Sequence, residues 1–235
     1  MATTVEARID PVRIVVINAG VSDPSSTRML AERIAQRSLE RLSEAKVAAA
    51  LAIIDLAPLA VDIAKAVVAG FPGERLQAAI DTLAHADAAI AATPVYKAGM
   101  SGLFKSFIDL LDNDLLIAKP VVLAATGGSA RHAIVPDEQM RPLFGYMRAI
   151  PVPTSIFASP EDWSDPALTA RIDRVAVELS VFVTKDVGSA IVNAGWSAYQ
   201  HQFGGNALRA DQAADGVDFD TDLMRLATGG SLSPA

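Results

Sequence analysis

Continuous apolar runs alternate with amphipathic segments over most of this chain, and the alternation limits the possible folds more than any other feature. The runs are typical of strands buried on both faces and lie at residues 14–18, 47–56, 88–93, 120–125 and 154–158. The amphipathic segments carry their apolar residues on one helical face and lie at residues 30–42, 76–84, 102–111, 138–150 and 168–182. Strands that alternate with helices pair in parallel, and the helices cover both faces of the sheet. We therefore predict an α/β fold with a doubly wound, five-stranded parallel sheet.

Composition and charge exclude several kinds of site. The 235 residues include no cysteine, which excludes disulfides, thiolate catalysis and cysteine-ligated zinc. The three histidines are widely separated, so no metal site is predicted. A formal charge of −7 and a pI of about 4.9 argue against nucleic-acid binding. We find no secretion signal and no apolar run long enough to cross a membrane, so we expect no membrane association and a cytoplasmic location.

The last fifth of the chain differs in composition from the rest. Residues 186–235 include six aspartates and two arginines, and they end in a segment rich in glycine and serine. We predict one domain over residues 1–185 and a C-terminal extension over residues 186–235 that is partly disordered. The aromatic residues Trp196, Tyr199 and Phe203 indicate that the first half of the extension packs against the site or a neighbouring subunit.

The loop after the first strand has the composition of an anion site. A ligand of an open parallel sheet binds beyond the carboxyl ends of the strands, where this loop lies. The loop combines hydroxyl groups with a helix start, whose free N–H groups and dipole attract anions. These residues are Ser22, Ser25, Ser26, Thr27 and Arg28. Helix capping alone is the other explanation. The motifs of nucleotide-triphosphate loops and of Rossmann dinucleotide folds are absent.

Two further loops carry glycine or proline after the third and fourth strands. The loop after the third strand includes Pro94, Val95, Tyr96, Lys97 and Ser101. The loop after the fourth strand includes Thr126, Gly127, Gly128 and Ser129. Such loops let a flat ring lie against bare backbone, although a half-buried tyrosine, a solvated lysine and a plain turn would explain them too. Together the three loops fit a mononucleotide with a planar heterocycle, such as flavin mononucleotide (FMN).

Two motifs resemble a known family. Residues 91–111 read AATPVYKAGMSGLFKSFIDLL and closely resemble the ATPVYKAxxSGxxKxxxDLL signature of the flavodoxin-like NAD(P)H-dependent FMN reductases. Residues 125–129, ATGGS, followed by His132, are similar to the ATGGxxxH segment of the branch that supplies reduced flavin for alkanesulfonate oxidation. Reductases paired with luciferase-like monooxygenases are the other related branch. The similarity spans about residues 13–160.

The resemblance implies a flavodoxin-like sheet of order 2-1-3-4-5 and an FMN-binding domain over residues 1–185. It places the FMN phosphate on the five first-loop residues and the ring against residues 94–97, Ser101 and residues 126–129. It implies NADPH or NADH as the reductant and a homodimer or homotetramer. Lys105 and Asp109 match the signature but fall within a helix, where a structural or subunit-contact role is expected. Asp23 departs from the family, which often has an arginine in the first loop.

An FMN reductase needs no acid–base pair, because hydride transfer is the chemistry of the cofactors themselves. We therefore predict no catalytic side chain, and we expect reduced FMN to leave for a flavin-dependent monooxygenase. Arg131 and His132 would contact the phosphates of the dinucleotide, or form a solvated surface pair. The alternatives are a flavin-retaining quinone or azo reductase, a non-enzymatic flavodoxin-type electron carrier and a serine hydrolase. The first loop argues against the hydrolase, because it lacks the second glycine of a nucleophile elbow.

Overall fold

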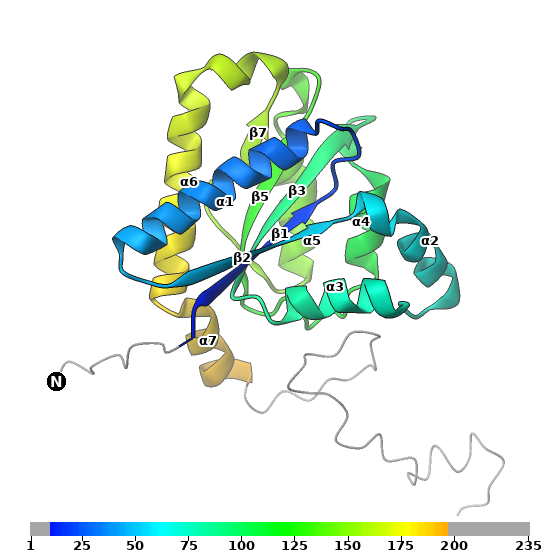
Figure 1. Cartoon of the computed structure of the whole chain (residues 1–235), viewed down its shortest axis with the longest axis horizontal. Coiled ribbons are helices and arrows are strands. Elements are labelled where there is room, and N and C mark those ends of the chain that lie inside the picture. Colours follow the sequence, from blue (N-terminus) through cyan, green and yellow to red (C-terminus); the bar gives the residue numbers. More distant parts are fainter. Residues whose placement is uncertain (1–9, 197–235) are drawn as a thin grey trace, which may run out of the picture.

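The computed structural model describes residues 10–196, which form a twisted sheet between two layers of helices (Figure 1). The strands are β1 (Val12–Asn18), β2 (Ala49–Asp55), β3 (Ala88–Tyr96), β4 (Gly99–Met100), β5 (Pro120–Thr126), β6 (Ile150–Pro151) and β7 (Ile156–Ala158). The α-helices are α1 (Ser26–Glu44), α2 (Ala60–Ala69), α3 (Glu74–Ala84), α4 (Gly102–Asp109), α5 (Arg141–Tyr146), α6 (Pro166–Thr184) and α7 (Val187–Ile191). Two π-helical turns, η3 (Pro136–Met140) and η5 (Val192–Trp196), and three short 3₁₀ helices complete the described part.

The strand order confirms the predicted flavodoxin-like topology. The hydrogen-bonded order is β2-β1-β3-β5-β6, and the pairs β1–β2, β1–β3 and β3–β5 are parallel. The sheet has seven strands and not the predicted five, because two short strands, β6 and β7, pair with successive parts of β5. The seventh is β4, which pairs antiparallel with the end of β3. The strand predicted over residues 154–158 is therefore present as the shorter β7, and β6 is an additional strand before it.

Strand β1 shows how both faces of the sheet are buried. Val12, Ile14 and Val16 pack in the cluster that includes α1 and α6. Val15 and Ile17 pack in the cluster on the other face, which includes α3 and α4. Successive side chains of a strand point to opposite faces, so a continuous apolar run is what a central strand between two helical layers requires.

The segment predicted as one helix over residues 138–150 is divided in the structure. It forms the π-helical turn η3, the short helix α5 and the beginning of β6 at Ile150. Prolines at 151 and 153 explain the interruption that follows, because a proline has no N–H to donate to a sheet. The side chain of Arg141 donates to the carbonyl oxygens of Val152 (3.0 Å) and Pro153 (3.2 Å), which holds this segment beside α5.

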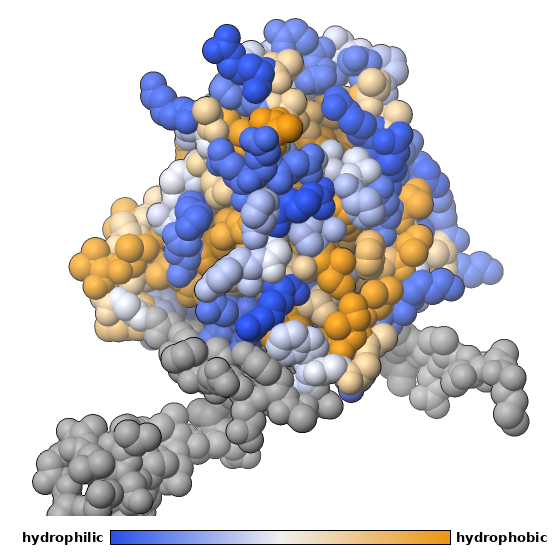
Figure 2. Space-filling model, turned by 180° about the vertical axis from the view of Figure 1, so that it is seen from behind, coloured by the Kyte–Doolittle hydropathy of each residue, from blue (hydrophilic) through white to orange (hydrophobic). Residues whose placement is uncertain are grey.

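Helix α2 was not predicted. Its sequence is mostly valine and alanine, which leaves no clear contrast between an apolar and a polar face. The helix exposes the apolar side chains of Val61, Val67 and Val68, with Val68 89% exposed, and Phe71 in the following loop is exposed too. Seen from behind in Figure 2, the part of the molecule that holds α2 lies at the left margin, where orange apolar residues gather. Within residues 10–196, no helix combines the length and the apolarity needed to span a bilayer.

The first residues of the predicted extension pack on the domain. Helix α7 lies so close to β5 that a Cβ on Gly188 would be 2.7 Å from the carbonyl oxygen of Ala118. The guanidinium of Arg148 lies 5.2 Å from the ring centroid of Trp196. Trp196 therefore contacts its own chain, whereas Tyr199 and Phe203 lie outside the described residues, as does most of the predicted extension. The boundary at residue 185 stays a prediction.

Candidate functional site

The three loops that the sequence singled out meet at one edge of the sheet. From β1 the chain continues to the neighbouring strand β2 on one side of the sheet, and from β3 it continues to β5 on the other side (Figure 1). The strand order therefore reverses between β1 and β3. Ligands of doubly wound sheets bind at such a switch point, beyond the carboxyl ends of the strands. The parallel register aligns Asn18 with Ala92 and Pro94 with Thr126. The loops after β1, β3 and β5 therefore share this edge.

The first loop is shaped by a close approach between Gly20 and Ser25. The N–H of Gly20 donates to Oδ1 of Asn18 at 3.0 Å. A Cβ on Gly20 would lie 2.0 Å from Oγ of Ser25, so no larger residue fits without displacing that hydroxyl. Ser25 is the N-cap of α1, and its Oγ accepts from the N–H of Arg28 at 3.2 Å. Capping uses one lone pair of Ser25 and leaves its O–H free to donate to an anion. Capping and anion binding are therefore compatible here.

Arg28 is held by two carboxylates. Its Nε donates to Oε1 of Glu32 at 2.7 Å, and its Nη1 pairs with Oδ2 of Asp55. The hydrogen bonds to Glu32 and then to Asp55 raise the pKa of Arg28 above its usual value. Asp55 also accepts from Nδ2 of Asn18 at 2.9 Å, which joins the ends of β1 and β2. The positive charge of Arg28, which was predicted to bind a phosphate, is therefore already balanced by two carboxylates. Ser22, Asp23 and Ser26 are exposed.

Two predicted site residues from different loops contact each other directly. Oγ1 of Thr27, in the first turn of α1, lies 2.7 Å from Oγ1 of Thr126, the last residue of β5. Both residues are buried. One hydroxyl donates and the other accepts, so of the two hydroxyl protons only that of the accepting hydroxyl remains to be donated to another partner. This pair holds the start of α1 against the end of β5.

The second loop is tighter than the sequence indicated. Pro94, Val95 and Tyr96 continue β3, and a two-residue turn at Lys97 and Ala98 connects it to β4. Both turn residues have positive φ, at 49° and 63°. Gly99 and Gly102 do not have positive φ, so Lys97 and Ala98 form the turn itself. The side chain of Tyr96 is exposed at the tip, and so is that of Lys97.

Ser101 ends the second loop and caps helix α4. Its N–H donates to Oγ1 of Thr93 at 3.0 Å, and its Oγ accepts from the N–H of Phe104 at 3.2 Å as the N-cap of α4. Ser101 is buried. At the other end of α4, Lys105 and Asp109 form an ion pair one helical turn apart. Both are exposed, and the structural or subunit-contact role expected for them stays a prediction.

The third loop uses its glycines in two different ways. The N–H of Gly127 donates to the carbonyl of Ala158 at 3.1 Å, and a Cβ there would lie 3.0 Å from the ring of Phe157. Gly127 is therefore required for packing. A Cβ on Gly128 would meet no atom within 4 Å, so its backbone faces open space. Ser129 follows in an extended conformation and precedes the 3₁₀ helix η2 (Ala130–His132), where Arg131 is exposed and His132 half-buried.

The structure also brings three residues to this edge that the sequence did not single out. Asn18 and Asp55 join the ends of β1 and β2. Asn18 had a visible signal, since it is the polar residue that ends an apolar run. Gln139 hydrogen-bonds to the turn between β3 and β4, and nothing in its local sequence distinguishes it from an exposed helical glutamine.

Comparison with known proteins decides the family. The profile of the NADPH-dependent FMN reductase family matches residues 12–164. The chain belongs to this family. The NADH-dependent FMN reductase SfnE of Pseudomonas putida is 36% identical over 176 residues, which is 73% of this chain and 91% of the relative. The FMN reductase (NADPH) of Pseudomonas aeruginosa PAO1 is 37% identical over 175 residues, 72% of this chain and 90% of the relative.

A solved structure extends the similarity to three dimensions. An oxidoreductase from Corynebacterium diphtheriae superposes with a TM-score of 0.72 at 39% identity, covering 74% of this chain and 98% of the other. The predicted family, the oxidoreductase class and the use of FMN with a reduced nicotinamide are thereby confirmed. The two relatives are named for different nicotinamides, so both NADPH and NADH stay in the prediction.

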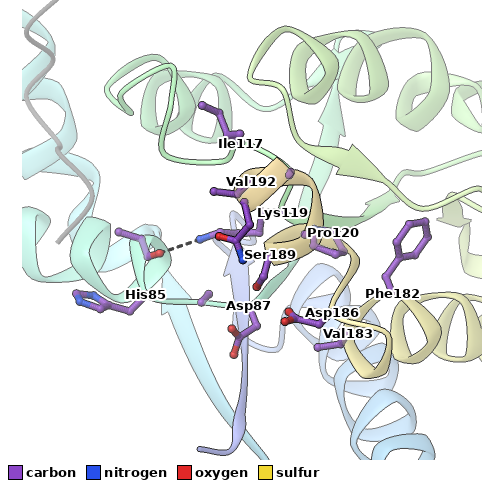
Figure 3. A pocket seen from close by; sticks show the side chains of 15 residues that line it. His85, Asp87, Ile117, Lys119, Pro120, Phe182, Val183, Asp186, Ser189 and Val192 are labelled. Carbon is purple, nitrogen blue, oxygen red and sulfur yellow. Dashed lines mark hydrogen bonds between the residues drawn. The ribbon is translucent and has the colours of Figure 1, made fainter. Parts of the chain in front are cut away.

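A cavity of about 550 Å³ lies at the opposite edge of this FMN reductase fold (Figure 3). It is lined by residues that precede β3 and β5 and by residues of α7, among them His85, Asp87, Lys119 and Ser189. Nζ of Lys119 donates to the carbonyl of Ala84 at 3.0 Å and also to that of Leu83, at the end of α3. An ammonium at the negative end of a helix stabilises that helix. Lys119 therefore has a structural role here, away from the switch point.

Proposed function

We propose that this FMN reductase binds FMN in the loops after β1, β3 and β5, reduces it with NADPH or NADH, and releases reduced flavin to a separate flavin-dependent monooxygenase. The observation that carries the proposal is the convergence of the three loops at the β1–β3 switch point. Family membership supports the reaction. The release step is supported by the motif resemblance and by the charges around the first loop.

The residues at this edge fit FMN. For the phosphate we assign the hydroxyls and N–H groups at the start of α1, contributed by Ser22, Ser25, Ser26, Thr27 and Arg28. For the ring we assign the hairpin and the third loop, contributed by Pro94, Val95, Tyr96, Lys97, Ser101, Thr126, Gly127, Gly128 and Ser129. The first loop is closely packed at Gly20, and the backbone of the third loop is open at Gly128, where a Cβ would meet no atom within 4 Å. Bound FMN supplies the hydride chemistry, and the chain supplies orientation and electrostatics.

The charges around the first loop favour release of the flavin. Arg28 is paired with Glu32 and Asp55, and Asp23 is exposed nearby in the sequence. A phosphate dianion must therefore rely mainly on neutral donors and on the helix dipole, which contribute less than a free guanidinium. Modest affinity suits a flavin that is a substrate and not a retained prosthetic group. Arg131, which is exposed after the third loop, and the half-buried His132 are our candidates for contact with the phosphates of the nicotinamide dinucleotide.

A homodimer or homotetramer remains part of the proposal. The large apolar side chains of α4 and α5 do not form an interface, because Phe104, Phe107 and Phe144 are fully buried within the subunit. The rings of Phe104 and Phe144 lie 6.3 Å apart between centroids. Any subunit contact on this side must therefore use residues nearer the surface, such as Tyr146, which is 71% exposed.

The test is steady-state oxidation of NADH and of NADPH by the full chain, with and without added free FMN. We expect the purified protein to be colourless after dialysis and its activity to depend on added FMN. A yellow protein that oxidises the nicotinamide without added FMN would favour a flavin-retaining reductase. Absence of both flavin binding and nicotinamide oxidation would refute the proposal as a whole.

A further inference from the structure

The turn that joins β3 to β4 has an unusual composition for its shape. Two residues, Lys97 and Ala98, connect the paired residues Tyr96 and Gly99, and both have positive φ. This is the geometry of a type I′ hairpin turn, for which asparagine and glycine are strongly preferred. Lysine and alanine disfavour that region because their Cβ atoms crowd the backbone. Local preference does not hold this turn in place, so a contact from elsewhere must contribute.

Gln139 provides that contact through both ends of its carboxamide. Its Nε2 donates to the carbonyl of Ala98 at 2.9 Å, and its Oε1 accepts from the N–H of Met100 at 3.2 Å. Gly99 lies between these two bonds, and a Cβ there would be 3.1 Å from Oε1. The small residue thus allows the amide to approach the backbone on both sides.

The position of Gln139 depends on the π-helical turn η3. The N–H of Arg141 donates to the carbonyl of Pro136, five residues back, which widens the turn relative to an α-helix. Such turns are rare and occur frequently at functional sites. This turn carries Gln139 to the hairpin tip, next to residues 94–97, which our proposed function assigns to the flavin ring.

We propose that Gln139 is a positioning residue for the flavin: its carboxamide holds the Lys97–Ala98 turn in the conformation that faces the ring. This inference rests on the proposed function. Gln139 acts through the hairpin and does not itself need to touch FMN. The proposal requires that the need for Gln139 disappears when the turn no longer depends on it.

The experiment compares FMN binding, by quenching of flavin fluorescence, in full-length Gln139→Ala, Gln139→Ala with Ala98→Gly, and wild type. Loss of the two hydrogen bonds is expected to raise the FMN dissociation constant about tenfold. Glycine adopts positive φ without strain, so Ala98→Gly is expected to restore most of the lost affinity. Glu138→Ala, an exposed neighbour on the same turn, is the matched control and should bind as wild type does.

A second variant and a second measurement make the outcome decisive. Gln139→Glu keeps the length and the acceptor but loses the donor to Ala98, so it should also weaken binding and carries the test if Gln139→Ala does not fold. Hydrogen exchange of the Met100 amide should become faster in Gln139→Ala. Unchanged FMN affinity in both variants, or a loss that Ala98→Gly does not restore, overturns the inference while the proposed function stands. A wild-type protein that binds no FMN overturns the proposed function first.

Discussion

Replacing Thr126 with valine tests whether the hydrogen bond between the hydroxyls of Thr126 and Thr27 stabilises the folded protein. Oγ1 of Thr126 lies 2.7 Å from Oγ1 of Thr27, and both residues are buried. Valine keeps the shape of Thr126 but leaves the Thr27 hydroxyl without this partner, which costs about 1–3 kcal/mol. For a domain of this size, each kcal/mol lowers the melting temperature by roughly 2–4 °C. We therefore expect Thr126→Val to melt about 2–12 °C below wild type.

The double variant gives the sharper result. Replacing both partners with apolar groups of the same shape removes the unsatisfied hydroxyl, so Thr27→Val with Thr126→Val should be more stable than Thr126→Val alone. Thr126→Ser keeps the hydroxyl and serves as the control. The assay is thermal unfolding of the FMN-free protein, followed by circular dichroism. If the double variant loses the sum of the two single losses, the two hydroxyls do not depend on each other and the reasoning is refuted.

Three further predictions concern the loops around the proposed flavin site. Gly20→Ala places a Cβ 2.0 Å from Oγ of Ser25 and should weaken FMN binding at least about tenfold in a fluorescence titration; normal affinity would contradict the assigned phosphate loop. Asp55→Asn removes one of the carboxylates that balance Arg28 and should tighten FMN binding by up to about fivefold, since a pair of this kind contributes up to about 1 kcal/mol. Weaker or unchanged binding would show that the pairing does not limit affinity. Arg131→Ala should raise KM for the nicotinamide dinucleotide without changing KM for FMN, and an unchanged dinucleotide KM would remove Arg131 from the site.

The sequence by itself determined the architecture and the edge of the sheet at which we propose the site. Apolar runs such as residues 14–18 and 88–93 indicate strands that are buried on both faces. Such a run consists of consecutive residues, so it can be recognised without knowledge of the tertiary structure. Alternation with helices then forces parallel pairing, which brings the carboxyl ends of those strands to one edge. The three loops were therefore recognisable, and the residues of the second and third loops also matched the family motifs.

Only the tertiary structure decided which groups are engaged with one another at that edge. Arg28 meets Asp55 across 27 positions, Thr27 meets Thr126 across 99, and Gln139 meets Met100 across 39. No local periodicity records such contacts, because each depends on how separate helices and strands pack. The turn at Lys97 and Ala98, where both residues have positive φ, is likewise not recorded in the local sequence. Local sequence specifies which face of an element is buried, whereas the partner of a polar group is specified only when the elements come together.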